Sequence, residues 1–117
     1  MSKKILAIDD EVPILEAIKT ILDDMGYSVT IFSNSIEGES AALSENYDLI
    51  LIDMRMPERN GAEVTRNIMA RKPDSKILII TAFPGDPLAK QSLDAGAKGL
   101  VKKPFEIGKI LSFLREE

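Results

Sequence analysis

Three short apolar segments, each followed at once by a polar residue, constrain the fold of this chain more than any other feature. Residues 5–8, 49–52 and 77–80 consist almost entirely of Ile, Leu and Ala, without alternation between polar and apolar positions. This composition is typical of strands that are buried on both faces. The sequence therefore predicts a sheet whose central strands are covered on both sides.

Segments with helical spacing of apolar residues lie between and after these strands. Apolar stripes predict helices over 14–25, 61–72 and 107–114, a weaker helix over 35–45 that is interrupted at Gly38, and a short one over 87–95. Two further strands are expected at 28–32 and 99–101. Alternation of strands and helices predicts an α/β fold with a mostly parallel sheet and helices on both faces, formed as one domain over residues 1–117.

The residue types that the chain lacks limit its chemistry. It has no Cys and no His, which excludes thiolate nucleophiles, Ser-His-Asp triads and zinc sites of the ordinary type. Its net charge of -4 argues against a nucleic-acid surface. Apolar segments are too short for a signal peptide or a membrane span. We therefore expect a cytoplasmic protein that binds neither nucleic acid nor membrane directly.

Side chains that can carry chemistry follow four of the five predicted strands. In chain order they are Asp9 and Asp10, Asp53, Thr81, and Lys102 and Lys103. Ligands of open parallel sheets bind at the carboxyl ends of the strands, so we expect these side chains to meet there. Each alone has an ordinary explanation as a turn, cap or surface residue, but their joint placement favours a site. Glu58 and Arg59 have no such support and are predicted to be solvated surface.

The expected cluster of carboxylates requires compensating positive charge. Unit charges ~4 Å apart repel by ~4 kcal/mol at an intermediate dielectric, and one lysine balances only part of that repulsion. Mg²⁺ suits a site with a few carboxylates and an opening for phosphate, and a phosphate could bridge the metal and the amine. Asp53 is the expected nucleophile because it ends a central strand, whereas Asp9 and Asp10 are placed on an outer loop with Glu11.

These residues resemble the motifs of the receiver domain of two-component response regulators, and the resemblance covers essentially the whole chain. The matching motifs are Asp9-Asp10-Glu11, Asp53-Met54-Arg55-Met56-Pro57 followed by Asn60-Gly61, Thr81-Ala82, and Lys103-Pro104-Phe105. The resemblance implies a flavodoxin-like fold with strand order 2-1-3-4-5. It also implies that Asp53 accepts a phosphoryl group from a phosphohistidine on a sensor histidine kinase or phosphotransfer protein.

The same resemblance implies roles for the residues around Asp53. Asp9, Asp10, Asp53 and the backbone carbonyl of Arg55 would bind Mg²⁺, and Lys103 would pair with a phosphoryl oxygen. Thr81 would follow the phosphoryl group and so act as a switch. Leu100 stands where the family often has the aromatic residue of that switch, and a cis peptide bond is expected before Pro104.

The resemblance further implies a signalling switch that catalyses only its own phosphorylation and dephosphorylation. A downstream protein would bind the face formed by residues 87–95, 99–101 and 107–114, and the chain would be a monomer or weak dimer. One alternative is an aspartyl-phosphate phosphatase of the haloacid-dehalogenase type, whose Asp-x-Asp motif is not matched by the adjacent Asp9 and Asp10. Another is a flavodoxin-type electron carrier, whose flavin phosphate this acidic pair would repel.

Overall fold

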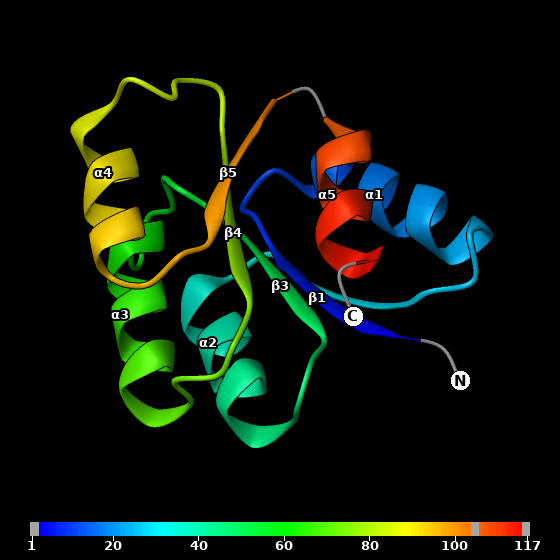
Figure 1. Cartoon of the computed structure of the whole chain (residues 1–117), viewed down its shortest axis with the longest axis horizontal. Helices are drawn as coiled ribbons and strands as arrows, with labels where there is room; N and C mark the ends of the chain where they lie inside the picture. Colours follow the sequence, from blue (N-terminus) through cyan, green and yellow to red (C-terminus); the bar gives the residue numbers. More distant parts are fainter. Residues whose placement is uncertain (1–2, 104–105, 116–117) are drawn as a thin grey trace.

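The computed structural model describes residues 3–103 and 106–115, which form one sheet with helices on both faces (Figure 1). Strands and helices alternate along the chain. The strands are β1 (Lys4–Ile8), β2 (Ser28–Phe32), β3 (Leu49–Asp53), β4 (Ile77–Thr81) and β5 (Gly99–Lys102). The helices are α1 (Val12–Asp24), α2 (Ser35–Ser44), α3 (Gly61–Arg71), α4 (Pro87–Asp94) and α5 (Ile107–Arg115). The predicted α/β architecture is confirmed.

All strand pairings are parallel, and the order across the sheet is β2-β1-β3-β4-β5. The strand order implied by the resemblance is therefore confirmed, and β3 is the middle strand. The order of the strands reverses between β1 and β3, which are hydrogen-bonded neighbours. Open α/β sheets bind their ligands at such a reversal, beyond the carboxyl ends of the strands.

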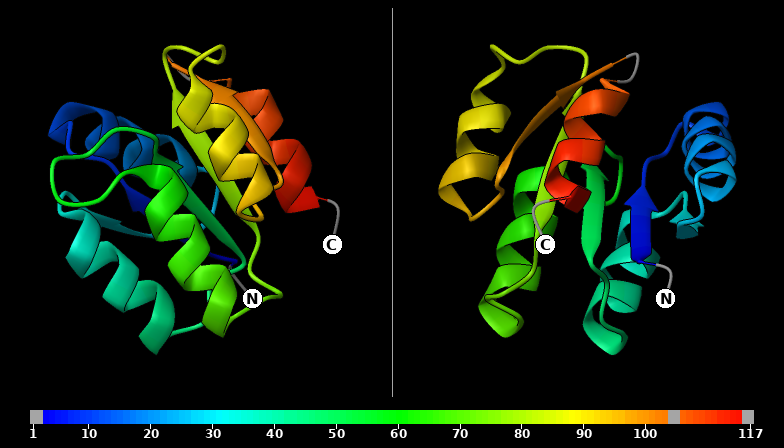
Figure 2. Two further views of the ribbon diagram at one scale, coloured as in Figure 1. Left: turned by 90° about the vertical axis from the view of Figure 1, so that its left-hand side faces the viewer. Right: turned by 45° about the vertical axis from the view of Figure 1, so that its right-hand side comes forward.

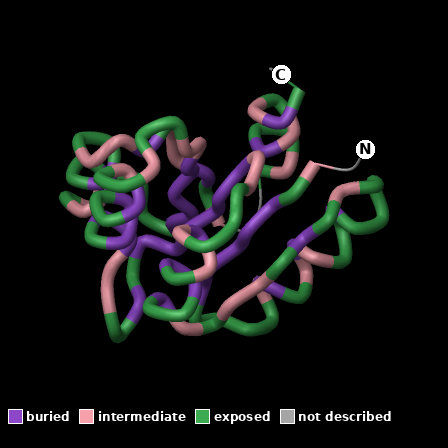
Figure 3. The backbone as a smooth tube through the Cα atoms, turned by 90° about the horizontal axis from the view of Figure 1, so that it is seen from below, coloured by how far each residue is buried: buried purple, intermediate pink, exposed green. Residues whose placement is uncertain are grey.

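The sheet separates two apolar clusters, as its composition predicted. Alternate residues of each central strand point to opposite faces: Ile5 and Ala7 join the cluster under α1 and α5, whereas Leu6 and Ile8 join the cluster under α2, α3 and α4. Figure 2 shows the two groups of helices on opposite sides of the sheet. Figure 3 shows the buried trace concentrated in the strands between them. None of the helices in the described part of the chain is long and apolar enough to cross a membrane.

Helix α2 is continuous through Gly38, so the predicted interruption is wrong. A Cβ atom at position 38 would lie 2.7 Å from side-chain atoms of Ile8, closer than real Cβ contacts. The glycine therefore lets α2 pack closely on β1. Local helix preferences alone predict that a glycine weakens the helix at this position. The close contact with Ile8, thirty residues earlier in the sequence, explains why a glycine is needed there.

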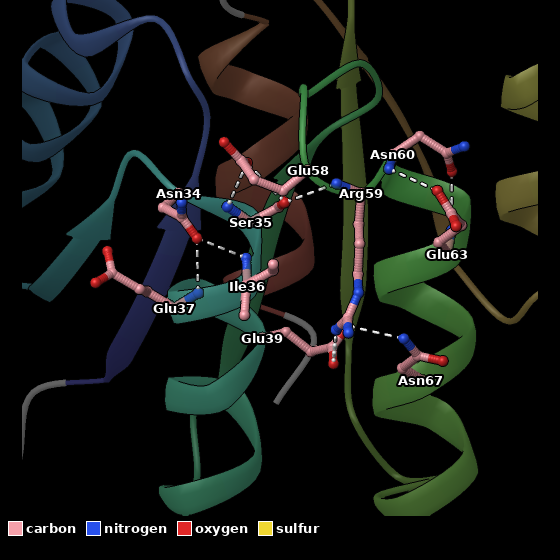
Figure 4. Close-up of polar contacts among 10 residues, drawn as sticks. All are labelled: Asn34, Ser35, Ile36, Glu37, Glu39, Glu58, Arg59, Asn60, Glu63 and Asn67. Carbon is pink, nitrogen blue, oxygen red and sulfur yellow. Dashed lines mark hydrogen bonds and ion pairs between the residues drawn. The ribbon is translucent and has the colours of Figure 1, made fainter.

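Glu58 is exposed, as predicted, whereas Arg59 is only partly exposed, contrary to the prediction, and both side chains make specific contacts (Figure 4). Glu58 Oε1 accepts hydrogen bonds from the backbone N–H and the hydroxyl of Ser35, at 3.1 and 2.9 Å, which lower the pKa of Glu58. Arg59 Nη1 donates to Glu39 Oε2 at 2.6 Å, and Asn67 Nδ2 donates to the other oxygen of Glu39 at 2.9 Å. These contacts fix the loop of residues 54–60 to α2 and join α2 to α3.

Arg59→Met is expected to lower the free energy of unfolding by about 1–3 kcal/mol, because it leaves the buried carboxylate of Glu39 without its cationic partner. Urea denaturation measures the change. Lys90→Met is the matched control, since it also removes a cation from an ion pair, but both partners of the Lys90–Asp94 pair are exposed. Equal, small losses in the two variants would contradict a structural role for Arg59.

Candidate functional site

The side chains that follow β1 and β3 meet at the carboxyl edge of the sheet. Carboxylate oxygens of Asp9, Asp10 and Asp53 lie within 4.8 Å of one another. Asp53 is the last residue of β3 and stands opposite Ile80 of the neighbouring strand β4. Asp9 and Asp10 directly follow β1, which pairs with β3 on the side opposite to β4. The sheet thus places three acids around its central strand.

Lys103, directly after β5, provides positive charge to this group. Its Nζ lies 3.2 Å from Asp53 Oδ1, 3.2 Å from Asp9 Oδ2 and 2.7 Å from Glu11 Oε1. Its backbone N–H donates to the carbonyl of Thr81 at 2.9 Å, which ties the end of β5 to the end of β4. The side chain is only 11% exposed, so the ammonium group is held among the acids and not in open solvent.

Asp9 is fully buried, so its predicted placement on an outer loop is wrong. Asp10 is exposed, as an outer-loop residue would be. The backbone N–H of Glu11 donates to Asp9 Oδ1 at 2.9 Å, and the turn folds Asp9 inward. Sequence reasoning gave Glu11 no role in the site, although its side chain binds Lys103; the acidic run 9–11 was the available signal.

Burial and mutual repulsion shift the pKa values of the central groups. Burial, followed by the charge of Asp9, raises the pKa of Asp53 to about 8 despite Lys103. Burial also raises the pKa of Asp9, although the N–H of Glu11 and the ammonium of Lys103 oppose the shift. Burial disfavours the charged form of Lys103, but its carboxylate partners outweigh this effect and raise its pKa. Full ionisation of these acids is therefore disfavoured in the metal-free site, because Lys103 alone does not balance their charges.

The backbone after Asp53 is held closely against the start of α3. The N–H of Gly61 donates to the carbonyl of Met54 at 2.8 Å, and the N–H of Met54 donates to the carbonyl of Ile80 at 3.1 Å. A Cβ atom at position 61 would lie 2.8 Å from the carbonyl oxygen of Asp53. Only glycine permits this approach. The Asn60 side chain and Glu63 then begin α3 with a capping box.

The site opens into a cavity of about 270 Å³. The cavity is lined by Asp10, Glu11, Asp53, Met54, Arg55, Thr81, Ala82, Phe83 and Lys103. The Thr81 hydroxyl is nearly buried and accepts a hydrogen bond from the N–H of Phe83 at 2.9 Å. Leu100 is partly buried and packs against the cluster under α2, α3 and α4, while Pro104 lies outside the described residues.

The residues of the site fit a hard divalent cation. Asp9 Oδ2 is buried and accepts no hydrogen bond from the described residues, even though Lys103 lies 3.2 Å away. A buried carboxylate oxygen without such a partner is costly, and a metal ion would satisfy it. Carboxylate oxygens in the absence of imidazole or thiolate ligands suit Mg²⁺ and not zinc.

Comparisons with known proteins agree with this geometry. Residues 5–115 match the family described as the response regulator receiver domain. The chain is 37% identical over 111 residues to the uncharacterized transcriptional regulatory protein YkoG of Bacillus subtilis, a match that covers 95% of this chain and 49% of YkoG. The chain thus spans about half the length of the curated relatives that it matches.

Two solved structures show the same fold at high similarity. A CheY-like response regulator receiver domain protein from Methanospirillum hungatei superposes with a TM-score of 0.91 at 30% identity, covering 99% of this chain and 93% of that one. The response regulator TrrA from Thermotoga maritima, solved in complex with Mg²⁺-BeF, superposes with a TM-score of 0.82 at 32% identity, covering 97% of both chains.

The chain belongs to the response regulator receiver domain family. Receiver domains of two-component response regulators are phosphorylation-dependent signalling switches, and this chain is one of them. Response regulators work with histidine kinases and with downstream effectors. The comparisons give no support to the phosphatase alternative of the haloacid-dehalogenase type.

Proposed function

We propose that Asp53 is the residue that accepts the phosphoryl group, in a Mg²⁺-dependent reaction with a phosphohistidine donor. One observation carries the proposal: the buried carboxylate of Asp53 stands within 4.8 Å of the Asp9 and Asp10 carboxylates and 3.2 Å from the Lys103 ammonium. A nucleophilic carboxylate between a cation site and an amine has what phosphoryl transfer needs. The domain acts only on its own phosphorylation state.

Asp9, Asp10 and Asp53 would bind the metal through their carboxylates, together with the backbone carbonyl of Arg55. When bound, Mg²⁺ supplies positive charge that balances the phosphoryl oxygens. Asp9 is fixed for this role by the N–H of Glu11, whereas the exposed Asp10 leaves one side open to the donor. The contacts of Glu58 and Arg59 with α2 hold the loop that contains Arg55.

In the transfer step, a carboxylate oxygen of Asp53 attacks the phosphorus atom. The P–N bond to the donor imidazole breaks, and its electron pair stays on the imidazole nitrogen. Lys103 stabilises the charge that develops on the phosphoryl oxygens and must loosen its contact with the exposed Glu11 to do so. Thr81 lines the same cavity and would turn its hydroxyl to the phosphoryl group, giving up its hydrogen bond from Phe83.

The output of the switch is proposed to pass through the face formed by α4, β5 and α5. Leu93 of α4 is an exposed apolar side chain there, and Leu100 of β5 is only partly buried. Both lie on elements that follow the loop of residues 82–86, next to Thr81. Leu100, which stands opposite Ile79 of β4, would take the position of the switch residue. The cytoplasmic location and the monomeric or weakly dimeric state stay predictions from the sequence.

Incubation with a small acyl-phosphate donor and Mg²⁺, followed by intact-mass spectrometry, tests this proposal. The expected result is one added phosphoryl group, which is absent after chelation of the metal and absent in Asp53→Asn. Continuous turnover of a generic phosphate ester would instead favour a phosphatase. Undiminished labelling of Asp53→Asn would contradict the assignment of the acceptor.

A further inference from the structure

The side chain of Arg55 connects the phosphorylation site to α4. Arg55 comes two residues after Asp53 and lines the cavity. Its Nε donates to Asp86 Oδ2 at 3.1 Å, and its Nη2 donates to the same oxygen. The guanidinium side chain is 63% exposed, whereas that of Asp86 is 13% exposed. The exposed arginine side chain therefore has room to change its rotamer, whereas the mostly buried carboxylate of Asp86 does not.

Asp86 also begins α4. Its Oδ1 accepts the N–H of Leu88 at 2.9 Å, the capping contact of the first turn, and its own N–H donates to the carbonyl of Phe83 at 3.0 Å. The carboxylate of Asp86 therefore accepts hydrogen bonds from Arg55 at one oxygen and from the first turn of α4 at the other. A change in the partner of Arg55 alters the electrostatic environment of this cap.

We infer that Arg55 exchanges partners, leaving Asp86 for the phosphoryl group on Asp53, and that the Arg55–Asp86 ion pair is a latch whose opening couples phosphorylation to the start of α4. The inference rests on the proposed phosphorylation of Asp53. It adds a second connection between the site and α4, made by an arginine side chain in addition to the proposed movement of Thr81.

Charge balance favours the exchange. Phosphorylation replaces one carboxylate charge by a phosphoryl group of charge about -1.5 to -2, which increases the negative charge in the cavity. Lys103 already forms ion pairs with three carboxylates. Arg55 is the other cation among the described residues that line the cavity. An ion pair with an exposed arginine is weak, whereas a bidentate bond from a guanidinium to a phosphoryl group is strong.

The exchange has a reciprocal consequence that can be measured. If Asp86 competes with the phosphoryl group for Arg55, then weakening the latch must strengthen binding of a phosphoryl mimic. Asp86→Asn is a suitable change, because asparagine caps a helix as well as aspartate does while lacking the charge. Asp94→Asn is the control: it also removes one carboxylate charge, at the other end of α4, but Asp94 pairs with Lys90 and not with Arg55.

Binding of beryllofluoride, a phosphoryl mimic that attaches to carboxylates, is followed by ¹⁹F NMR in the presence of Mg²⁺. Asp86→Asn is expected to lower the apparent dissociation constant about three- to tenfold, because a larger fraction of Arg55 is free to bind the mimic. Asp94→Asn is expected to leave it unchanged. In an Arg55→Gln background, Asp86→Asn is expected to have no effect.

The amide resonance of Leu88 supplies a readout that a purely structural role of Asp86 would not produce. Its shift on beryllofluoride binding is expected to shrink in Arg55→Gln. An equal effect of Asp86→Asn with and without Arg55, or no effect in either background, would overturn the latch while leaving the acceptor proposal intact. Failure of the wild-type protein to bind beryllofluoride with Mg²⁺ would instead contradict the proposed site itself.

Discussion

Lys103→Met is expected to slow phosphorylation of Asp53 by a small acyl phosphate about 10²-fold or more, while Mg²⁺ binds as tightly as before or more tightly. The ammonium lies 3.2 Å from Asp53, where it stabilises charge that develops on the transferring group. Its removal also leaves the acids less balanced, which favours a divalent cation. Intact-mass kinetics and a Mg²⁺ titration monitored by NMR measure the two effects separately.

Lys102→Met is the matched control for this prediction. The neighbouring lysine is exposed, and its contact with Glu106 is made by the backbone N–H, which the substitution preserves. The phosphorylation rate of Lys102→Met is expected to stay within about twofold of wild type, since water and salt screen the charge of an exposed side chain. Similar losses of rate in the two variants would mean that Lys103 acts only through the overall charge of the protein and not through its contact with Asp53.

Asp53→Asn is expected to stabilise the metal-free protein by about 1–3 kcal/mol at pH 7.5 and by less at pH 5. In the folded protein the pKa of Asp53 is raised from its ordinary value of 3.8 to about 8, because of burial and then the charge of Asp9. The unfolded chain releases this proton near pH 4, so wild-type stability falls as the pH rises from about 4 to 8. Asparagine cannot ionise and avoids that loss.

Urea denaturation in the presence of a chelator, at both pH values, measures this gain. Asp74→Asn, a change of the same type at an exposed turn, is expected to shift stability by less than about 0.5 kcal/mol at either pH. Added Mg²⁺ should stabilise the wild type more than Asp53→Asn, because the variant lacks one metal ligand. A gain that is the same at both pH values would show that packing, and not charge, is responsible.

The sheet and the location of the site could be predicted because both depend on short local patterns. Strands β3 and β4 are apolar up to the polar residue that ends each of them, and the side chains at the ends of β1, β3, β4 and β5 must come to one edge once the strands are parallel. Asp53 and Lys103 are fifty residues apart in sequence, yet the fold class alone is enough to bring them together.

The contacts that support the site could not be predicted in the same way. The ion pairs Arg59–Glu39 and Arg55–Asp86 form because loops bring their partners together, and the paths of these loops depend on packing and not on a repeating sequence pattern. A glycine is needed at position 38 because the side chain of Ile8, on β1, packs directly against it. The inward turn of Asp9 depends on a single backbone hydrogen bond from Glu11. Single charged residues in loops carry no sequence signal that separates a paired side chain from a solvated one.

Chemical mapping of the phosphorylated residue tests the central claim most directly. Borohydride reduces an aspartyl phosphate to homoserine, and peptide mass spectrometry then locates the altered residue in protein treated with acyl phosphate and Mg²⁺. Homoserine at position 53, and at no other acidic position, is the predicted result. Homoserine at position 9 or 10, with residue 53 unchanged, would contradict the claim that the carboxylate at the end of β3 is the phosphoryl acceptor.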